Sequence, residues 1–303
     1  MKVQIKHTTH ISYGVPVVEG VMDVRLGPRS DADQQWQEYE LRATPNAAIR
    51  RYYDGFGNTA HLVTIARAHD TVELASCGVV DTLLDDPFRL PPTQPAPLGP
   101  SELADYLTPS AMVPADPALT EMARPFRPGS PDETLEAVQR LMGLVYHDFQ
   151  YEQDVTSVAT TVPEVLKHRT GVCQDFAHVL IGLCRAIELP ARYVSGYIVP
   201  RQAPQTQRQT LGTMSQSQTL GGSSDADSGP SRGHGASHAW VEVFTPTHGW
   251  RGFDPTNNLL ASTHHVKMGI GRDYNDVPPT RGTFRGVAEE KLTVEVDARP
   301  LTD

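Results

Sequence analysis

The sequence predicts an α+β protein, in which an N-terminal antiparallel β-sandwich precedes a core of helices packed on an antiparallel sheet. In the first 85 residues, short runs of alternating apolar and polar side chains are separated by turn residues, which is typical of half-buried strands. After residue 130, two stretches with helical periodicity are followed by two alternating stretches that predict a strand hairpin. We expect a β-rich domain over residues 1–85, a Pro-rich connector over 86–130 and the core over 131–303.

Composition excludes several classes of partner. The chain has 303 residues and a formal net charge of −10, without any Lys/Arg-rich run, which argues against nucleic acid or an anionic membrane surface. Residues 1–7 lack the apolar core of a signal peptide, and no run approaches the roughly 20 apolar residues of a membrane span. We therefore expect a soluble cytoplasmic protein. The 3 cysteines include no CxxC pair, so neither a disulfide framework nor a structural zinc site is indicated.

The N-terminal stretch contains several predicted strands. From Val3 to Tyr13 the odd positions are mostly apolar and the even ones polar. Trp36, Tyr39 and Leu41 shift phase once, as a β-bulge would cause. A further strand is expected over Val72 to Val80, which is rich in β-branched residues.

Proline density marks the connector. Twelve of the 25 prolines lie between Pro87 and Pro131, which forbids long helices and leaves room for short ones around Ser101–Leu107 and Pro117–Ala123. A capping box at 130–133 then opens an amphipathic helix with an apolar stripe. We expect this helix to pack on the next long helix, which carries Cys173.

That next helix follows Thr170, a plausible N-cap, and its apolar face begins just after Cys173. Unpaired backbone N–H groups and the positive end of the helix dipole favour a thiolate at such a position. Cys184, in contrast, fits the apolar face and is expected to be a buried core residue. A short helix is expected before it, over Pro163–Lys167, and a strand after it, over Ala191–Val199.

The region 201–235 differs from the rest of the core. It contains no aromatic residue and is dominated by Gln, Ser, Thr and Gly, so we expect a flexible insert. Such long inserts are either functional lids or plainly disordered.

The stretch from Ser237 to Phe244 alternates strictly, and Trp250 to Asp254 reads as a returning strand. A tight hairpin with its loop at 245–247 places His238 opposite Asp254 on the same face, with Cβ atoms roughly 5 Å apart. An aspartate that accepts one imidazole N–H leaves the other ring nitrogen free to take a thiol proton. Cys173, His238 and Asp254 are therefore the candidate catalytic residues.

Four blocks of sequence resemble the bacterial transglutaminase-like superfamily. They are Gly-Val-Cys-Gln-Asp-Phe-Ala-His from Gly171, Leu-Pro-Ala-Arg-Tyr-Val-Ser-Gly-Tyr from Leu189, Ser-His-Ala-Trp-Val-Glu-Val-Phe from Ser237 and Gly-Trp-Arg-Gly-Phe-Asp-Pro-Thr-Asn from Gly249. The first 80 or so residues are similar to the β-rich region that precedes this core, and 271–282 is similar to its C-terminal block.

The resemblance implies a papain-like α+β core in which Cys173 is the nucleophile, His238 the general base and acid, and Asp254 the orienting carboxylate. It implies acyl transfer through a thioester, with a protein or peptide substrate. Because the sequence contains no EF-hand pattern, no calcium and no other cofactor is expected. The oxyanion would be held by the Cys173 N–H and a second donor, for which Gln150 and Tyr151 are candidates. The predicted function is cysteine-dependent amide or peptide hydrolysis; the alternatives are a protein-glutamine transglutaminase and a non-catalytic binding module with this fold.

Other polar and aromatic residues receive structural interpretations. His178 and Asp175 are expected to be structural, and His264 and His265 to be solvated. A zinc site of His234, His238 and a cysteine lacks a fourth ligand at a suitable spacing, so no metal is expected. The aromatic residues of the hairpin are expected to pack within it; these are Trp240, Trp250 and Phe253.

Overall fold

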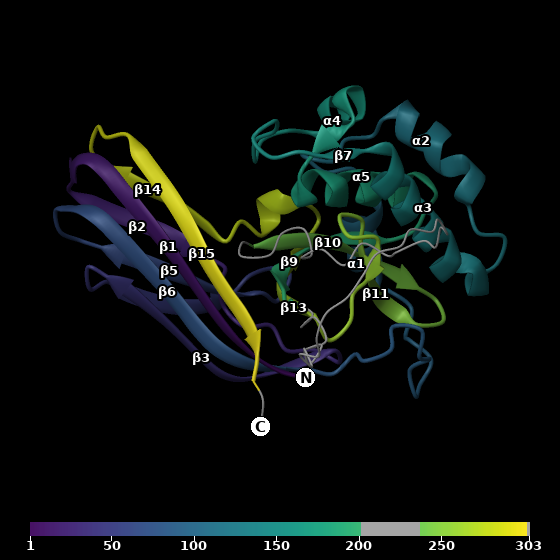
Figure 1. Cartoon of the computed structure of the whole chain (residues 1–303), viewed down its shortest axis with the longest axis horizontal. Helices are drawn as coiled ribbons and strands as arrows, with labels where there is room; N and C mark the ends of the chain where they lie inside the picture. Colours follow the sequence, from purple (N-terminus) through teal and green to yellow (C-terminus); the bar gives the residue numbers. More distant parts are fainter. Residues whose placement is uncertain (201–236, 302–303) are drawn as a thin grey trace, which may run out of the picture.

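The computed structural model of the chain describes residues 1–200 and 237–301. The predicted flexible insert at 201–235 lies outside these residues. Figure 1 shows a β-sandwich on one side, helices on the other and a separate sheet between the sandwich and the helices.

The β-sandwich consists of two four-stranded antiparallel sheets, in the orders β15-β1-β6-β3 and β14-β2-β5-β4. Its apolar side chains alternate with polar ones as the sequence predicts, and the inward ones form a core that includes Ile11, Val63 and Leu74. The strands are β1 (Lys2–Val17), β2 (Glu19–Val24), β3 (Gln34–Thr44), β4 (Ala48–Tyr53), β5 (Thr59–Ile65), β6 (His69–Thr82), β14 (Thr280–Arg285) and β15 (Glu290–Pro300).

The predicted β-bulge in the third strand is confirmed. Between Trp36 and Glu38 the register of β3 on β6 shifts, so that Trp36 pairs with Val80 and Glu38 with Val79. The extra residue accounts for the single change of phase in the apolar pattern.

The last two strands return to the N-terminal sandwich. β14 pairs with β2, and β15 pairs with β1 along almost its whole length, from Val3 opposite Pro300 to Tyr13 opposite Glu290. Figure 1 shows both strands lying on the sandwich, and Leu301 N–H donates to the Lys2 carbonyl at 2.9 Å. The structure thus differs from the predicted ranges 1–85 and 131–303, because the sandwich contains strands from both ends of the chain.

The helices match the sequence expectations apart from two helix starts, those of α3 (Thr134–Asp148) and α5 (Cys173–Ala186). Residues 131–133 form a 3₁₀ turn, and the amphipathic helix begins at Thr134, although Ser130 does hydrogen-bond Glu133 at 3.0 Å. The helices are α1 (Pro100–Leu107), α2 (Pro117–Ala123), η1 (Arg124–Phe126), η2 (Pro131–Glu133), α3 (Thr134–Asp148), α4 (Val162–His168), α5 (Cys173–Ala186) and η3 (Tyr274–Asp276). None of the helices within 1–200 and 237–301 is long and apolar enough to cross a lipid bilayer.

The core sheet has five antiparallel strands in the order β12-β11-β10-β9-β13. One face packs on α3 and α5, where Leu141, Leu180 and Val241 belong to one buried cluster. The strands are β9 (Ala191–Ile198), β10 (His238–Thr245), β11 (Gly249–Asp254), β12 (Leu259–Leu260) and β13 (His265–Gly271), and a separate two-stranded parallel pair is formed by β7 (Gln150–Tyr151) and β8 (Thr170–Gly171).

The sandwich covers the outer edge of β13 with two amide side chains. Gln34 donates to the Lys267 carbonyl at 2.6 Å and accepts from the Lys267 N–H at 2.8 Å. Asn58 does the same with Ile270, at 2.7 and 2.9 Å. Each side-chain amide therefore pairs with the backbone N–H and C=O of one residue of the edge strand, as the backbone of a neighbouring strand would.

A buried charge cluster lies beside this contact. Glu242 on β10 accepts from Arg192 at 2.8 Å and pairs with Lys267 at 2.5 Å, and Lys267 also donates to Asp31 of the sandwich at 2.7 Å. Burial alone would raise the pKa of Glu242, but the two cations outweigh it and lower the pKa to about 2. The cluster joins the sandwich to the core sheet.

Candidate active site

Cys173 is the first residue of α5 and is partly exposed. Asp175, in the first turn, caps the helix: its Oδ2 accepts the Val172 N–H at 2.8 Å and the Thr156 hydroxyl at 2.6 Å. The predicted N-cap, Thr170, is wrong, because Thr170 lies in β8 and Val172 occupies the N-cap position. Cys184 is buried on the same helix, as expected, and burial raises the pKa of its thiol to about 12.

The segment between α3 and α4 borders the start of α5. Glu152 N–H donates to the Gly171 carbonyl at 3.0 Å, and Gln174 Nε2 donates to the Val158 carbonyl at 3.3 Å. Gln150 and Tyr151, the candidate second oxyanion donors, form β7, which pairs with β8 just before Cys173. Backbone and side-chain contacts on both sides therefore hold the Cys173 turn in place.

His238 and Asp254 meet across the β10–β11 hairpin, but not in the predicted register. Val241 pairs with Phe253 and Thr245 with Gly249, an offset of two residues from direct pairing of His238 with Asp254. Gly249 adopts φ +71 in the turn, which favours glycine. Because side chains alternate with a period of two, the offset of two residues keeps the His238 and Asp254 side chains on one face of the sheet. His238 Nε2 lies 2.9 Å from Asp254 Oδ2, with both side chains fully buried.

Asp254 is the most densely hydrogen-bonded group of the site. Its Oδ1 accepts the backbone N–H of Thr256 at 3.0 Å and of Asn257 at 3.3 Å. Its Oδ2 accepts from Asn257 Nδ2 at 2.9 Å as well as from His238. Burial raises the pKa of Asp254, but the charge and hydrogen bond of His238 outweigh burial, so the net shift is downward and the carboxylate stays ionised.

His238 is held as an imidazolium. Burial lowers the pKa of His238, but the charge and hydrogen bond of Asp254, together with the Cys173 thiol, raise it to about 10. Its Nε2 faces Asp254, and its Nδ1 is buried without a hydrogen-bond partner among the described residues. The ring thus has one nitrogen committed to the carboxylate and one available for proton exchange, and Cys173 is close enough to interact with it.

His265 also lies beside Asp254, which the sequence did not predict. It was expected to be solvated, but only 8% of it is exposed, and its Nε2 lies 3.4 Å from Asp254 Oδ2. The available signal was its place in the stretch 265–271, where Val266, Met268 and Ile270 alternate as in a strand; this stretch forms β13, whose residues are all buried.

Trp240 packs against both histidines that lie beside Asp254. Its ring stacks on His238 with 6.2 Å between centroids and meets His265 edge-on at 5.3 Å. A Cβ at Gly196 would lie 2.4 Å from the Trp240 ring, so glycine is required opposite it. Trp240 and Phe253 are fully buried, in agreement with a packing role.

The remaining candidate residues do not belong to the group formed by Cys173, His238 and Asp254. His178 is buried, accepts the Tyr274 N–H at 3.1 Å and has its pKa lowered to about 4 by burial. Within residues 1–200 and 237–301, no group of three or more His, Cys, Asp or Glu is placed to hold a metal ion. His234 lies outside the described residues.

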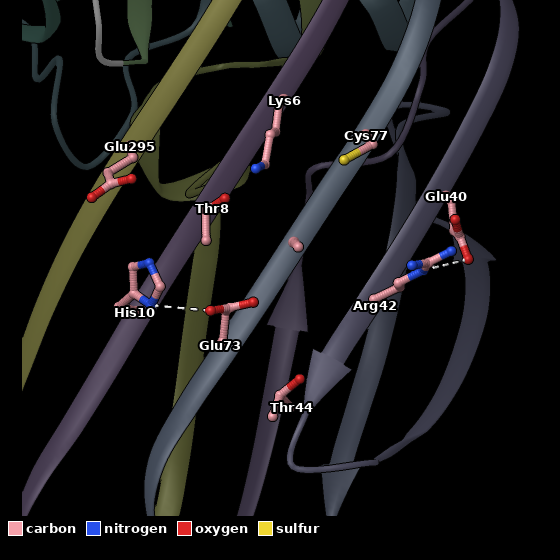
Figure 2. A pocket seen from close by; sticks show the side chains of 10 residues that line it. Lys6, Thr8, His10, Glu40, Arg42, Thr44, Glu73, Cys77 and Glu295 are labelled. Carbon is pink, nitrogen blue, oxygen red and sulfur yellow. Dashed lines mark hydrogen bonds and ion pairs between the residues drawn. The ribbon is translucent and has the colours of Figure 1, made fainter.

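The exposed Cys77 lies on the outer face of the sandwich, in a hollow of about 670 Å³ (Figure 2). Two side-chain pairs lie around it: His10 with Glu73 at 3.5 Å and Arg42 with Glu40 at 2.7 Å. Among the described residues no histidine is hydrogen-bonded to Cys77, which makes it an internal reference thiol.

Comparison with known proteins gives two family matches. Residues 120–255 match the transglutaminase-like superfamily, and residues 3–81 match the bacterial transglutaminase-like N-terminal region. An uncharacterized protein of Mycobacterium tuberculosis is 32% identical over 314 residues, which cover 98% of this chain and 92% of the relative. The chain belongs to the transglutaminase-like superfamily. The range matched to the superfamily core encloses Cys173, His238 and Asp254.

Two further proteins are similar to this chain over nearly its whole length, one in sequence and one in fold. An uncharacterized protein of Mycobacterium leprae is 27% identical over 303 residues and covers 99% of both chains. The crystal structure of a Cytophaga hutchinsonii protein, provisionally named a cysteine protease, has a TM-score of 0.69 at 22% identity and covers 100% of this chain and 92% of that one. The predicted α+β fold with a papain-like core is thereby confirmed.

Proposed function

We propose that this protein is a cysteine-dependent hydrolase of amide or peptide bonds, with Cys173 as nucleophile, His238 as general base and acid, and Asp254 as the orienting carboxylate. The observation that carries the proposal is the buried contact of 2.9 Å between His238 and Asp254, at a histidine that also interacts with the helix-borne Cys173. A solved structure provisionally named a cysteine protease has the same fold.

The proposed reaction follows from the two ring nitrogens. The Cys173 thiolate attacks the amide carbonyl carbon, and the carbon–nitrogen bond breaks as His238 Nδ1 gives its proton to the leaving amine. Water then gives a proton to His238 and attacks the thioester, the carbon–sulfur bond breaks, and the thiolate returns with a carboxylic acid as product. The Cys173 N–H, at the start of α5, is available to the oxyanion.

Alkylation of the thiols tests whether Cys173 and His238 form an ion pair. At neutral pH, Cys173 is expected to react with iodoacetamide faster than Cys77, because its thiol is paired with an imidazolium. The positive ring should also favour the anionic reagent iodoacetate, and this preference should fall as the pH rises through about 10, where His238 loses its proton. Cys173→Ala should leave only Cys77 to react, since Cys184 is buried. Equal rates at Cys173 and Cys77 in the wild type would contradict the proposal.

Product analysis separates hydrolysis from amine transfer. Glutamine-containing peptides and acyl amides are incubated with and without a labelled primary amine, and free acid is measured together with labelled adduct. We expect the free acid to dominate, because water is present in large excess over the amine. Dominant adduct would instead identify a transglutaminase. No product from any substrate, with an unreactive Cys173, would favour a non-catalytic binding module.

A further inference from the structure

Two histidines share one oxygen of the candidate catalytic carboxylate. Asp254 Oδ2 lies 2.9 Å from His238 Nε2 and 3.4 Å from His265 Nε2. The two histidines come from different strands, β10 and β13, which flank β9. His265 has no part in the three-residue scheme proposed above, although its side chain is only 4% exposed, against 0% for His238 and Asp254.

The hydrogen bonds of His265 define its tautomer. Its Nδ1 accepts the Ser262 N–H at 3.4 Å, so that nitrogen carries no proton. The ring proton therefore lies on Nε2 and is donated to Asp254 Oδ2. Burial lowers the pKa of His265, and although Asp254 opposes this, the neighbouring His238 and His264 lower it further. The ring is accordingly a neutral donor next to a positive one.

A second hydrogen-bond donor makes the Asp254 carboxylate a weaker acceptor for the first donor, His238. Each hydrogen bond to Asp254 Oδ2 withdraws negative charge from the oxygen that attracts the His238 proton. Asp254 is already oriented by the N–H groups of Thr256 and Asn257, so His265 is not needed to fix its rotation. What His265 adds is competition for Oδ2.

We propose that His265 is a positioning residue that shares Asp254 Oδ2 with His238 and so loosens the hold of the carboxylate on the His238 proton. This inference rests on the proposed acyl-transfer function. Loosening matters because His238 must release its Nδ1 proton to the leaving amine in acylation. If Asp254 binds the His238 imidazolium too tightly, the Cys173 thiolate stays reactive, but the imidazolium becomes a poor proton donor.

The test compares His265→Leu with His265→Gln, which keeps a donor, in a Cys77→Ser background. In His265→Leu, the loss of iodoacetate preference at Cys173 should move to higher pH by about one unit. Its kcat for amide hydrolysis should fall about tenfold, since one hydrogen bond to a charged group is removed. His265→Gln should restore both values, and His265→Met replaces His265→Leu if the latter does not fold.

His264→Leu is the matched control, because His264 bonds the Val199 carbonyl at 3.1 Å rather than Asp254. It should leave the pH profile and kcat unchanged. A merely structural role of His265 would slow alkylation and turnover together, and would overturn the inference, as would a pH profile that is unchanged or moves downward. If the wild-type Cys173 itself is unreactive, the proposed function fails; if Cys173 is reactive but His265→Leu behaves as the wild type, only this inference fails.

Discussion

Asp254→Asn is expected to lower kcat for amide hydrolysis by about 10⁴-fold. An amide N–H facing His238 would force Nε2 to become an acceptor and would place the ring proton on Nδ1, where the thiol proton must go. Turning the amide round does not help, because the NH₂ group would then face the N–H groups of Thr256 and Asn257. The expected loss is therefore a loss of the correct tautomer.

Steady-state kinetics measure this effect, with thermal unfolding as a check on the fold. The matched control is Asp54→Asn in the sandwich, where Asp54 Oδ1 accepts the N–H groups of Phe56 at 3.0 Å and Asn58 at 2.9 Å but, among the described residues, is hydrogen-bonded to no histidine. The control should keep the wild-type kcat. An Asp254→Asn protein that turns over at the rate of this control would show that Asp254 does not orient His238.

Glu242→Leu is expected to destabilise the protein by about 3–5 kcal/mol, because it leaves the buried Arg192 and Lys267 without their shared carboxylate. The change is measured as a shift of the urea unfolding midpoint. The same carboxylate predicts a pH dependence in the wild type. Since its folded pKa is lowered to about 2, its contribution is complete above the ordinary pKa of about 4.5 and is lost as the pH falls towards 2.

Glu40→Leu serves as the comparison for Glu242→Leu. Glu40 pairs with Arg42 at 2.7 Å, but both side chains are exposed on the sandwich surface. Water screens such a pair, so its removal should leave the unfolding midpoint where it is. Equal effects of the two substitutions would mean that the Glu242 cluster contributes no more than a surface ion pair.

The sequence predicted the elements of the candidate site better than their register. The alternation in 237–244 and 250–254 identified both strands, and the tight turn was placed one residue too early. That error moved the pairing by two residues, and a period of two left His238 and Asp254 on the same face. The reach of the two side chains across the diagonal then restored the contact.

Long-range pairing left little trace in the sequence. β15 carries side chains such as Leu292 and Val294 that are 45% and 37% exposed, so its pattern is that of an edge and does not say which strand it joins. His265 was missed for a related reason. Its partner Asp254 lies on another strand, and only the folded sheet brings the two together.

The pairing of β15 with β1 has a consequence for synthesis on the ribosome. Until Thr280–Arg285 and Glu290–Pro300 have emerged, β1 and β2 each lack one neighbour, and the nascent chain presents unpaired backbone on both N-terminal sheets. The core between them, by contrast, has all of its own strands once β13 has emerged. Strands translated late thus complete sheets whose other strands are translated early, and a ribosome that stops before residue 280 releases a chain with open, aggregation-prone edges.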